Sequence, residues 1–508
     1  MLYKLTLKEA SEKLAKGEIS SVELTESVIK RIEEIEPRVQ AFITTTFDLA
    51  RKQAFESDQR RKKGKTLSVI DGIPLAIKDL FCTKDIKTTA ASKILDDFVP
   101  FFESTPTKKL LAAGAVFVGK TNLDQFAMGS STETSAYKKT KNPWDLERVP
   151  GGSSGGSAAA VSADMCIAAI GTDTGGSIRQ PASLCSIVGL KPTYGRISRY
   201  GVIAMASSLD CIGPMTKTVE DSTILLNILA GKDYNDSTTL NNPVPDYQKS
   251  IGGNINGLRI GLPKEFFGAG MDTEVEKIVR EGIDKLKELG AEIIEISLPS
   301  VKYALAAYYV IMFAEVASNL ARYDGIRYGH SKLKASFCHA ELDLASKEIL
   351  KQVRDDGVSV LKEIYFKSRT EGFGDEAKRR IMLGNYVLSA GYYDAYYKKA
   401  QQVRTLVKKE FEEAFEDIDL MITPVSPTPA FKLGEKVSDP MQMYLSDIHT
   451  VPINPAGVPA ISIPAGFTNS GLPVGMQIIG PQLGEEKIFQ AANAFEKNTD
   501  FHKKRPQL

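Results

Sequence analysis

The sequence predicts an α/β protein: one large domain over residues 1–508, with helices on both faces of a mixed central β-sheet. Between residues 69 and 119, short apolar runs alternate with polar segments of helical pattern, which is typical of βαβ units. Hydrophobic residues make up 43% of the chain and charged residues 25%, as in ordinary globular proteins. No internal repeat, low-complexity tract or long linker divides the 508 residues into separate domains.

Individual elements follow from the spacing of apolar residues. Residues 5–35 carry apolar side chains at helical intervals, and the serine pair at 20–21 interrupts them, so we expect two amphipathic helices. The run at 258–263 predicts a strand, and the charged segment 273–289 predicts a helix. Residues 331–367 are polar with a helical pattern and no apolar stripe, which predicts an exposed helical elaboration.

Charge and composition exclude several kinds of protein. Lys and Arg number 64 against 63 Asp and Glu, so the net charge of +1 does not favour direct binding to nucleic acid. Five scattered cysteines without a CxxC pair, and only four histidines, offer no pattern for a metal site. The longest apolar run, Tyr303–Ala314, has 12 residues, whereas a bilayer needs about 20. With no apolar signal core at the N-terminus, we expect a cytoplasmic protein.

Two short motifs suggest other chemistries but fit them poorly. The segment Gly114–Thr121, GAVFVGKT, matches the phosphate-binding loop, but its middle residues are themselves strand-like, so the two glycines cannot form one loop. The segment 151–155, GGSSG, matches the nucleophile elbow of serine hydrolases, with Asp447 and His449 available downstream. No apolar strand directly precedes it, however, and that fold does not favour an acid and a base two residues apart.

A longer arrangement carries a consistent chemistry. Lys78 ends the apolar run of DGIPLAIKDL, and two Gly-Gly-Ser loops follow at 150–160 and 171–182. Serine hydroxyls on tight turns, beside bare backbone N–H groups, can supply a nucleophile and an oxyanion hole without histidine. A lysine can act as the base when burial in an apolar wall lowers its pKa and keeps it neutral. From the residues alone, structural turns and a surface lysine remain the alternative.

These segments resemble the signature of the amidase signature family. The similarity runs without gaps from PGGSSGGSAAA through GTDTGGSIRQPA to GLKPTYG, within a signature core of residues 65–220. The separations, 153 − 78 = 75 and 177 − 153 = 24, agree with the family's Lys, Ser, Ser arrangement. The resemblance implies that Ser177 is the acyl nucleophile, Ser153 the bridging serine and Lys78 the ultimate base.

The same resemblance implies further details of the site. In family members the bridging serine follows a cis peptide bond, which would be Gly152–Ser153 in this chain. The backbone N–H groups of Thr174, Gly175, Gly176 and Ser177 would form the oxyanion hole. The fold would be a single amidase-signature domain with the signature loops at strand ends.

Within the family, the whole chain is similar to the glutamine-hydrolysing subunits of tRNA-dependent amidotransferases, as in the segment EGFGDEAKRRIMLGNYVLSAGYYDAYYKKAQQVRT. In such members Arg380 would hold the α-carboxylate of glutamine, Asp447 would accept its α-ammonium, and Tyr308 or Tyr309 would line the pocket. A free amino acid carries one charge of each sign at its α-carbon, so a bidentate cation and an anion select it. The alternatives are a solvated helix charge for Arg380 and a turn or cap residue for Asp447.

The resemblance also implies an assembly. Ammonia released from glutamine would pass through a tunnel to a partner, the B subunit, and a small C subunit would complete a heterotrimer. The B subunit would contact the tRNA and activate Glu-tRNA(Gln) or Asp-tRNA(Asn) with ATP and Mg²⁺, so no cofactor is expected in this chain. Two other classes stay open. A stand-alone amidase of small or lipid amides needs neither Arg380 nor Asp447, and a catalytically silent scaffold needs no Lys78, Ser153 or Ser177.

Overall fold

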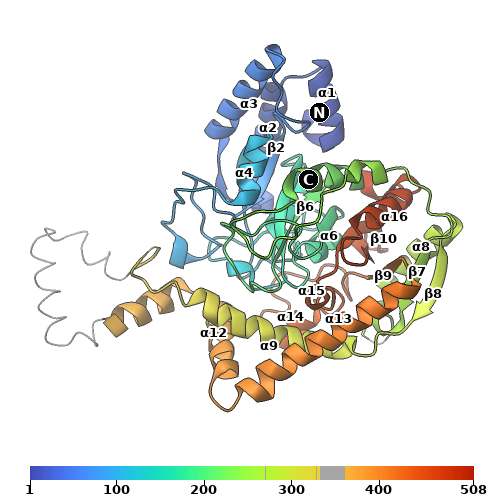
Figure 1. The fold of residues 1–508 in the computed structure, drawn as a ribbon. Coiled ribbons are helices and arrows are strands. Elements are labelled where there is room, and N and C mark those ends of the chain that lie inside the picture. Colours follow the sequence, from blue (N-terminus) through green and yellow to red (C-terminus); the bar gives the residue numbers. More distant parts are fainter. Residues whose placement is uncertain (269, 328, 332–360) are drawn as a thin grey trace, which may run out of the picture.

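A mixed β-sheet is the frame of the protein (Figure 1). The structure, a computed structural model, describes residues 1–268, 270–327, 329–331 and 361–508, and eleven strands form one sheet within these ranges. Across the sheet the strands lie in the order β1-β3-β2-β4-β6-β5-β10-β11-β9-β7-β8. Their bounds are β1 (Phe42–Thr45), β2 (Pro74–Lys78), β3 (Val116–Thr121), β4 (Ala168–Asp173), β5 (Val188–Lys191), β6 (Cys211–Thr216), β7 (Arg259–Pro263), β8 (Glu292–Ile296), β9 (Leu420–Pro424), β10 (Ala460–Phe467) and β11 (Pro473–Ile479).

The strands nearest the signature loops are parallel, as the βαβ pattern predicts. β2 lies between β3 and β4 and runs parallel to both. β6 pairs antiparallel with β4 and with β5, which makes the sheet mixed. Because the carboxyl ends of parallel strands meet at one edge, Lys78 at the end of β2 and Asp173 at the end of β4 lie at the same edge of the sheet. The loops that follow these strands therefore converge.

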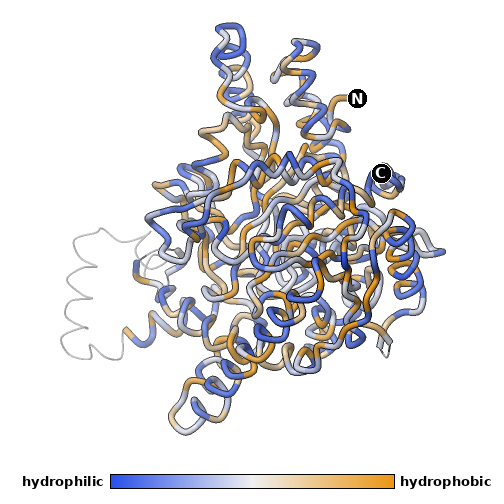
Figure 2. The backbone as a smooth tube through the Cα atoms, turned by 45° about the vertical axis from the view of Figure 1, so that its right-hand side comes forward, coloured by the Kyte–Doolittle hydropathy of each residue, from blue (hydrophilic) through white to orange (hydrophobic). Residues whose placement is uncertain are grey.

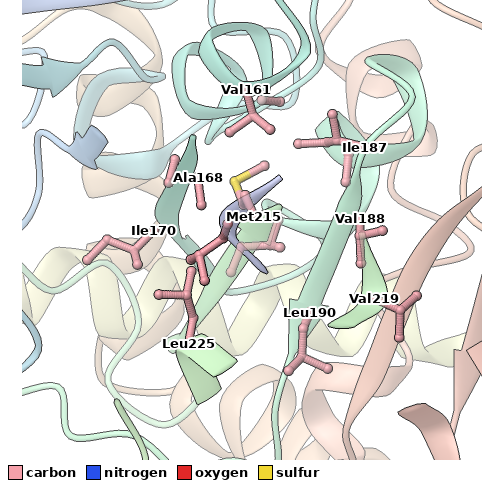
Figure 3. Packing of buried hydrophobic residues seen from close by; sticks show 14 of the residues in the cluster. Val161, Ala168, Ile170, Ile187, Val188, Leu190, Met215, Val219 and Leu225 are labelled. Atoms are coloured by element: carbon pink, nitrogen blue, oxygen red, sulfur yellow. The ribbon is translucent and has the colours of Figure 1, made fainter. Parts of the chain in front are cut away.

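Helices cover both faces of the sheet, which confirms the predicted architecture. On β9, Leu420 and Ile422 belong to the large hydrophobic cluster, whereas Met421 belongs to a separate one. Since side chains alternate along a strand, the two clusters lie on opposite faces of the sheet at β9. At β2 the large cluster includes the consecutive residues Leu75, Ala76 and Ile77, so hydrophobic side chains are buried on both faces there as well. Figure 3 shows part of the first cluster, where labelled side chains of β4, β5, β6 and α7 gather. In Figure 2 the hydrophobic segments lie mainly inside the protein, and the hydrophilic segments lie mainly along the outer helices.

Several helices pack in these two clusters, whereas most of α9 and the buried part of α12 belong to a third. α7, α8 and α16 contribute side chains to the first cluster, and α13, α15 and the start of α9 contribute to the second. α9 also packs against α12 and α13, and the three lie together at the lower side of Figure 1. Their bounds are α1 (Leu7–Lys16), α2 (Ser21–Val39), α3 (Phe47–Lys62), α4 (Thr105–Ala112), α5 (Gly155–Ser162), α6 (Arg179–Leu184), α7 (Val219–Leu229), α8 (Thr273–Glu288), α9 (Val301–Leu320), α12 (Asp375–Leu388), α13 (Lys399–Asp417), α14 (Pro440–Leu445), α15 (Ile453–Ala456) and α16 (Glu485–Lys497).

The two amphipathic helices expected at the N-terminus are α1 and α2. Ser20 separates them because it caps α2: its side chain accepts the N–H of Glu23, while the Glu23 carboxylate accepts the N–H of Ser20. Thr6 and Glu9 cap α1 in the same way. The predicted strand at 258–263 is β7, and the predicted charged helix at 273–289 is α8.

Two further segments bear on the sequence predictions. Residues 332–360 of the elaboration predicted at 331–367 lie outside the described residues; its described end, 361–367, is helical and largely exposed. α9 is longer than the 12-residue apolar run suggested, and by length and composition alone it could span a membrane. However, 61% of its most apolar window is buried inside the protein, as in a core helix.

Candidate active site

Lys78 lies at the centre of a buried group of hydroxyls. It is the last residue of β2, and its side chain is fully buried. Its Nζ lies 2.8 Å from Oγ of Ser153, 2.8 Å from Oγ of Ser154 and 2.8 Å from Oγ1 of Thr172. The contact between Lys78 and Ser153 matches the sequence prediction. Ser154 and Thr172 were not predicted, although both lie in the two Gly-Gly-Ser segments.

Burial prepares Lys78 to accept a proton. Desolvation lowers the pKa of Lys78 to about 7, although the negative charges of Asp124, Asp173 and Asp210 act in the opposite direction. Near neutral pH a large fraction of this lysine is therefore an uncharged amine. A surface lysine would be protonated under the same conditions.

The surrounding hydroxyls fit an uncharged amine. A neutral lysine has two N–H donors and one lone pair, which matches three hydroxyl neighbours. The Ser154 hydroxyl donates to the carbonyl oxygen of Thr172 at 3.1 Å, so its oxygen accepts from Lys78. The hydroxyl of Ser153 donates to no carbonyl oxygen in the described part of the chain, so it can donate its proton to the lone pair of Lys78.

The Ser153 loop lies directly against the Ser177 loop. The Gly152–Ser153 peptide bond is cis, as the resemblance implied. The N–H of Gly152 donates to Oε1 of Gln180 at 2.9 Å, which ties this loop to α6. The N–H of Ser154 donates to the carbonyl oxygen of Ser177 at 3.1 Å. The bridging serine and the predicted nucleophile thus belong to adjoining turns.

Ser177 is the accessible member of the predicted Lys-Ser-Ser set. It lies on the turn between β4 and α6, and 9% of its surface is exposed, whereas Lys78 and Ser153 are fully buried. Its Oγ makes no hydrogen bond to any residue that the structure describes, so the hydroxyl can turn toward Ser153 or toward a substrate. This is the disposition expected of a nucleophile.

A buried ion pair shapes the Ser177 turn. Nη2 of Arg179 lies 3.0 Å from Oδ1 of Asp173, and Nε lies 3.0 Å from Oδ2. Although burial alone would raise the pKa of Asp173, the Arg179 guanidinium holds it well below its usual range. The carboxylate also accepts the N–H groups of Gly176 at 2.9 Å and Ile178 at 3.2 Å. The turn that carries Ser177 therefore wraps around a fixed negative charge.

The oxyanion loop differs from the prediction at Gly176. Its N–H donates to the carboxylate of the buried ion pair and is not available to a substrate. In the described part of the chain, the N–H groups of Thr174, Gly175 and Ser177 have no acceptor, so these are the donors that can stabilise an oxyanion. A Cβ atom on Gly175 would lie 2.6 Å from the hydroxyl of Tyr308, so this tyrosine lies directly on the loop.

Arg380 is a buried cation, which contradicts the alternative of a solvated helix charge. It is 3% exposed, and its Nε donates to Oε1 of Glu376 at 2.8 Å. The guanidinium also lies over the rings of Tyr309 and Tyr444, 5.7 Å and 5.5 Å from their centroids. It borders a cavity of about 270 Å³. Nη2 has no partner among the described residues, so N–H donors remain for a carboxylate.

Asp447 follows α14 and lies close to the oxyanion loop. Ser130 Oγ donates to Oδ2 of Asp447 at 2.6 Å, and the Tyr309 hydroxyl lies 3.4 Å from the same oxygen. Burial raises the pKa of Asp447 to about 7, against the lowering effect of the Ser130 hydrogen bond. Thr450 donates from Oγ1 to the carbonyl oxygen of Gly175 at 2.7 Å, which places this segment beside the oxyanion loop.

Tyr309 connects the two charged side chains. Its ring faces Arg380, and its hydroxyl reaches Asp447. Tyr308, the tyrosine favoured from the sequence, lies over the oxyanion loop instead, with its ring 5.1 Å from that of Tyr309 in an edge-on arrangement. Neighbouring tyrosines on one helix face different partners, so the packing of α9 decides which one joins the charges.

The two alternative motifs do not form sites in the structure. Lys120, from the phosphate-loop match, lies within β3 and is buried, with Nζ 3.1 Å from Oδ1 of Asp79. His449 is buried beside Phe266, with ring centroids 6.0 Å apart, and its Nδ1 has no hydrogen-bond partner among the residues that the structure describes. Burial lowers the pKa of His449 to about 4. Among the residues described, no group of three or more His, Cys, Asp or Glu side chains could hold a metal ion.

Comparisons with known proteins agree with this geometry. The family model named Amidase matches residues 23–489. The A subunit of the glutamyl-tRNA(Gln) amidotransferase of Geotalea daltonii is 55% identical over 507 residues, covering 100% of both chains. The crystal structure of the corresponding A subunit from Thermotoga maritima superposes with a TM-score of 0.77 at 42% identity, covering 98% of this chain and 96% of that one. The peptide amidase of Stenotrophomonas maltophilia has a TM-score of 0.78 at 27% identity, covering 99% and 98%.

The chain therefore belongs to the amidase family, and its fold is that of the amidase-signature enzymes. The match extends over nearly the whole chain, from α2 to α16, and includes every residue of the site.

The uncharged state of Lys78 predicts the pH dependence of the reaction. On a neutral amide such as butyramide, kcat/KM should rise with pH and reach half its plateau near pH 7, because Lys78, with a pKa of about 7, accepts a proton only when uncharged. A neutral amide has no α-ammonium group for Asp447 to bind, so the titration of Asp447 does not change how this substrate binds. Initial rates across pH 5.5 to 9 test this, and a flat profile would contradict the role of Lys78 as base.

The position of His449 predicts that it takes no part in the chemistry. His449→Ala should keep kcat within about threefold of the wild type, whereas loss of a true triad histidine costs ~10⁴-fold. Steady-state kinetics measure the change, and the free energy of unfolding of the variant shows whether the buried cavity has weakened the fold. A loss of ~10⁴-fold in a folded variant would revive the serine-hydrolase alternative.

Proposed function

We propose that this chain is the glutamine-hydrolysing subunit of a tRNA-dependent amidotransferase. The observation that carries the substrate assignment is that one cation, Arg380, and one carboxyl group, Asp447, both contact Tyr309 beside the oxyanion loop. Such a pair matches the α-carboxylate and α-ammonium of a free amino acid. The full-length similarity to relatives named as A subunits of glutamyl-tRNA(Gln) amidotransferases supports the same assignment.

The reaction is acyl transfer to serine. Ser177 Oγ attacks the side-chain amide carbon of glutamine while its proton passes to Ser153 Oγ, and the proton of Ser153 passes to Nζ of Lys78. The oxyanion is held by the N–H groups of the loop. The C–N bond then breaks, and ammonia leaves with the proton returned through Ser153. Water hydrolyses the resulting γ-glutamyl ester, which releases glutamate and restores Ser177.

The remaining components follow from this role. Ammonia is useful only if it reaches an activated acceptor before it is lost to water, so the B subunit would receive it through a tunnel. That partner would bind ATP and Mg²⁺ and contact the tRNA, and the small C subunit would complete a cytoplasmic heterotrimer. No cofactor is needed in this chain, because the amide chemistry requires only its own lysine and serines.

A stand-alone amidase is the second candidate, since the peptide amidase of Stenotrophomonas maltophilia shares the fold. Arg380 and Asp447 argue against it. A neutral amide offers no carboxylate to the Nη2 donors that the contact of Arg380 with Glu376 leaves unused. A silent scaffold is disfavoured by the intact contact between Lys78 and Ser153.

The nucleophile provides a direct test. Ser177→Ala should lower ammonia release from glutamine by ~10³-fold or more, because no covalent intermediate can form. Amidation of the misacylated tRNA by the assembled complex should survive when ammonia itself is supplied. Ser157→Ala is the matched control: it removes another buried serine hydroxyl, which bonds to Thr121 and to the Ile170 carbonyl and does not contact Lys78. Glutaminase activity of Ser177→Ala close to the wild type would overturn the mechanism.

Arg380 tests the substrate. Arg380→Ala should lower kcat/KM for glutamine by roughly 30-fold or more, because loss of one partner strands the other charge in a partly dry pocket. Hydrolysis of butyramide, which has no α-carboxylate, should change little. Arg379→Ala is the matched control, since Arg379 borders the same cavity and pairs with the same Glu376 but is half-exposed. An equal loss on both substrates would mean that Arg380 supports the fold, and the glutamine assignment would fail.

A further inference from the structure

Asp210 is a buried carboxylate that no step described above uses. It directly precedes β6 and accepts three hydrogen bonds: from the Thr174 hydroxyl at 2.6 Å, the Met205 N–H at 3.0 Å and the Ala206 N–H at 3.2 Å. Every one of these partners is a donor, which is the environment of an ionised carboxylate. Burial raises the pKa of Asp210, and the three donors act in the opposite direction and favour its negatively charged form.

The hydrogen bond to Thr174 reaches the oxyanion loop. Thr174 is the first residue of that loop, and its own N–H is one of the available oxyanion donors. Its side chain borders a cavity of about 160 Å³, together with Thr172 and Asp210. Because empty space lies beside Thr174, packing alone does not fix its side chain, and the 2.6 Å hydrogen bond to Asp210 does.

Asp210 also contributes to the charge around Lys78. Three carboxylates act on that lysine, namely Asp124, Asp173 and Asp210. Of the three, Asp210 has the smallest effect on the lysine. Asp173 is ionised and paired with Arg179, and Asp124 accepts several hydrogen bonds from the loop at 131–134. Asp173 also holds the loop, through the N–H of Gly176, whereas Asp210 alone among the three accepts a hydrogen bond from the side chain of Thr174.

We propose that Asp210 is a positioning residue for the amide reaction: it holds the oxyanion loop through Thr174, and its negative charge acts on Lys78. The proposal rests on the function proposed above, because it concerns the same acyl transfer. It makes two separable claims, one about geometry and one about charge.

Burial also raises the pKa of Asp447 to about 7, but the charges that act most on it are those of Arg380, Asp124 and Asp173 rather than Asp210. The other titratable groups around Asp210 do not change charge near neutral pH. Burial raises the pKa of Tyr194, Tyr308 and Cys211, so all three remain uncharged there. Arg199 lies in the wall of the same cavity and contributes a positive charge there. A shift in the pH profile between 6 and 9 therefore reports on the lysine.

The charge claim is tested with Asp210→Asn. This change keeps the shape but removes the negative charge that favours the protonated lysine. On butyramide, the midpoint of the kcat/KM profile should move toward lower pH by about one unit. Asp236→Asn is the matched control: it removes a carboxylate that borders the same cavity but does not contact Thr174, and its midpoint should stay at the wild-type value.

The geometric claim is tested with Thr174→Val, which removes the hydroxyl donor and leaves the charge of Asp210 in place. We expect kcat to fall at least tenfold, because the loop N–H groups lose their fixed position, while the midpoint of the pH profile stays within ~0.2 unit. If Asp210→Asn does not fold, Thr174→Val still decides: wild-type kcat in this variant would overturn the proposal.

The outcomes separate this proposal from the function on which it rests. A wild-type protein that hydrolyses neither glutamine nor butyramide, alone or with partner subunits, would refute the proposed function itself. An active wild type with an Asp210→Asn variant that is slow but unshifted in pH would show a purely structural role for Asp210. A shifted midpoint for Asp210→Asn, together with a slow but unshifted Thr174→Val, would support both claims.

Discussion

The uncharged state of Lys78 is the constraint on which the rest of the site depends. Burying an ammonium group is costly, and this cost makes a base of a side chain that water would keep protonated. β2 creates the burial, because every residue from Pro74 to Lys78 is covered and parallel strands lie on both sides. Three hydroxyls rather than a carboxylate surround the amine, so no negative charge in direct contact restores the proton.

The carboxylates near Lys78 serve the fold and the chemistry at once. Asp173 holds the turn that carries the nucleophile, Asp124 holds the loop at 131–134, and Asp210 holds residues 205–206 and the start of the oxyanion loop. Each accepts several hydrogen bonds, so its charge is stabilised where it lies. Together they raise the pKa of Lys78 against the effect of burial, so the amine keeps enough affinity for a proton to act as a base.

Small residues allow the loops to come close enough to share these groups. A Cβ atom on Gly156 would lie 2.4 Å from the carbonyl oxygen of Asn122 and 2.6 Å from that of Ala41, so only glycine lets α5 approach the backbone that follows β3. The signature segment is rich in Gly, Ser and Ala for this reason. Serine supplies the hydroxyls, and glycine and alanine remove the bulk that would separate one loop from the next.

The sequence by itself determined the βαβ core, the capped helices on either side of Ser20, and the positions of Lys78 and Ser177, because each depends on near neighbours or on one contiguous motif. Only the tertiary structure decided that the N–H of Gly176 turns to a carboxylate and that Tyr309 joins the charged groups. These outcomes depend on contacts between distant segments, such as the hydrogen bond from Ser130 to Asp447, 317 residues apart. Burial of a side chain and the direction in which it points are set by such contacts, and no local pattern encodes them.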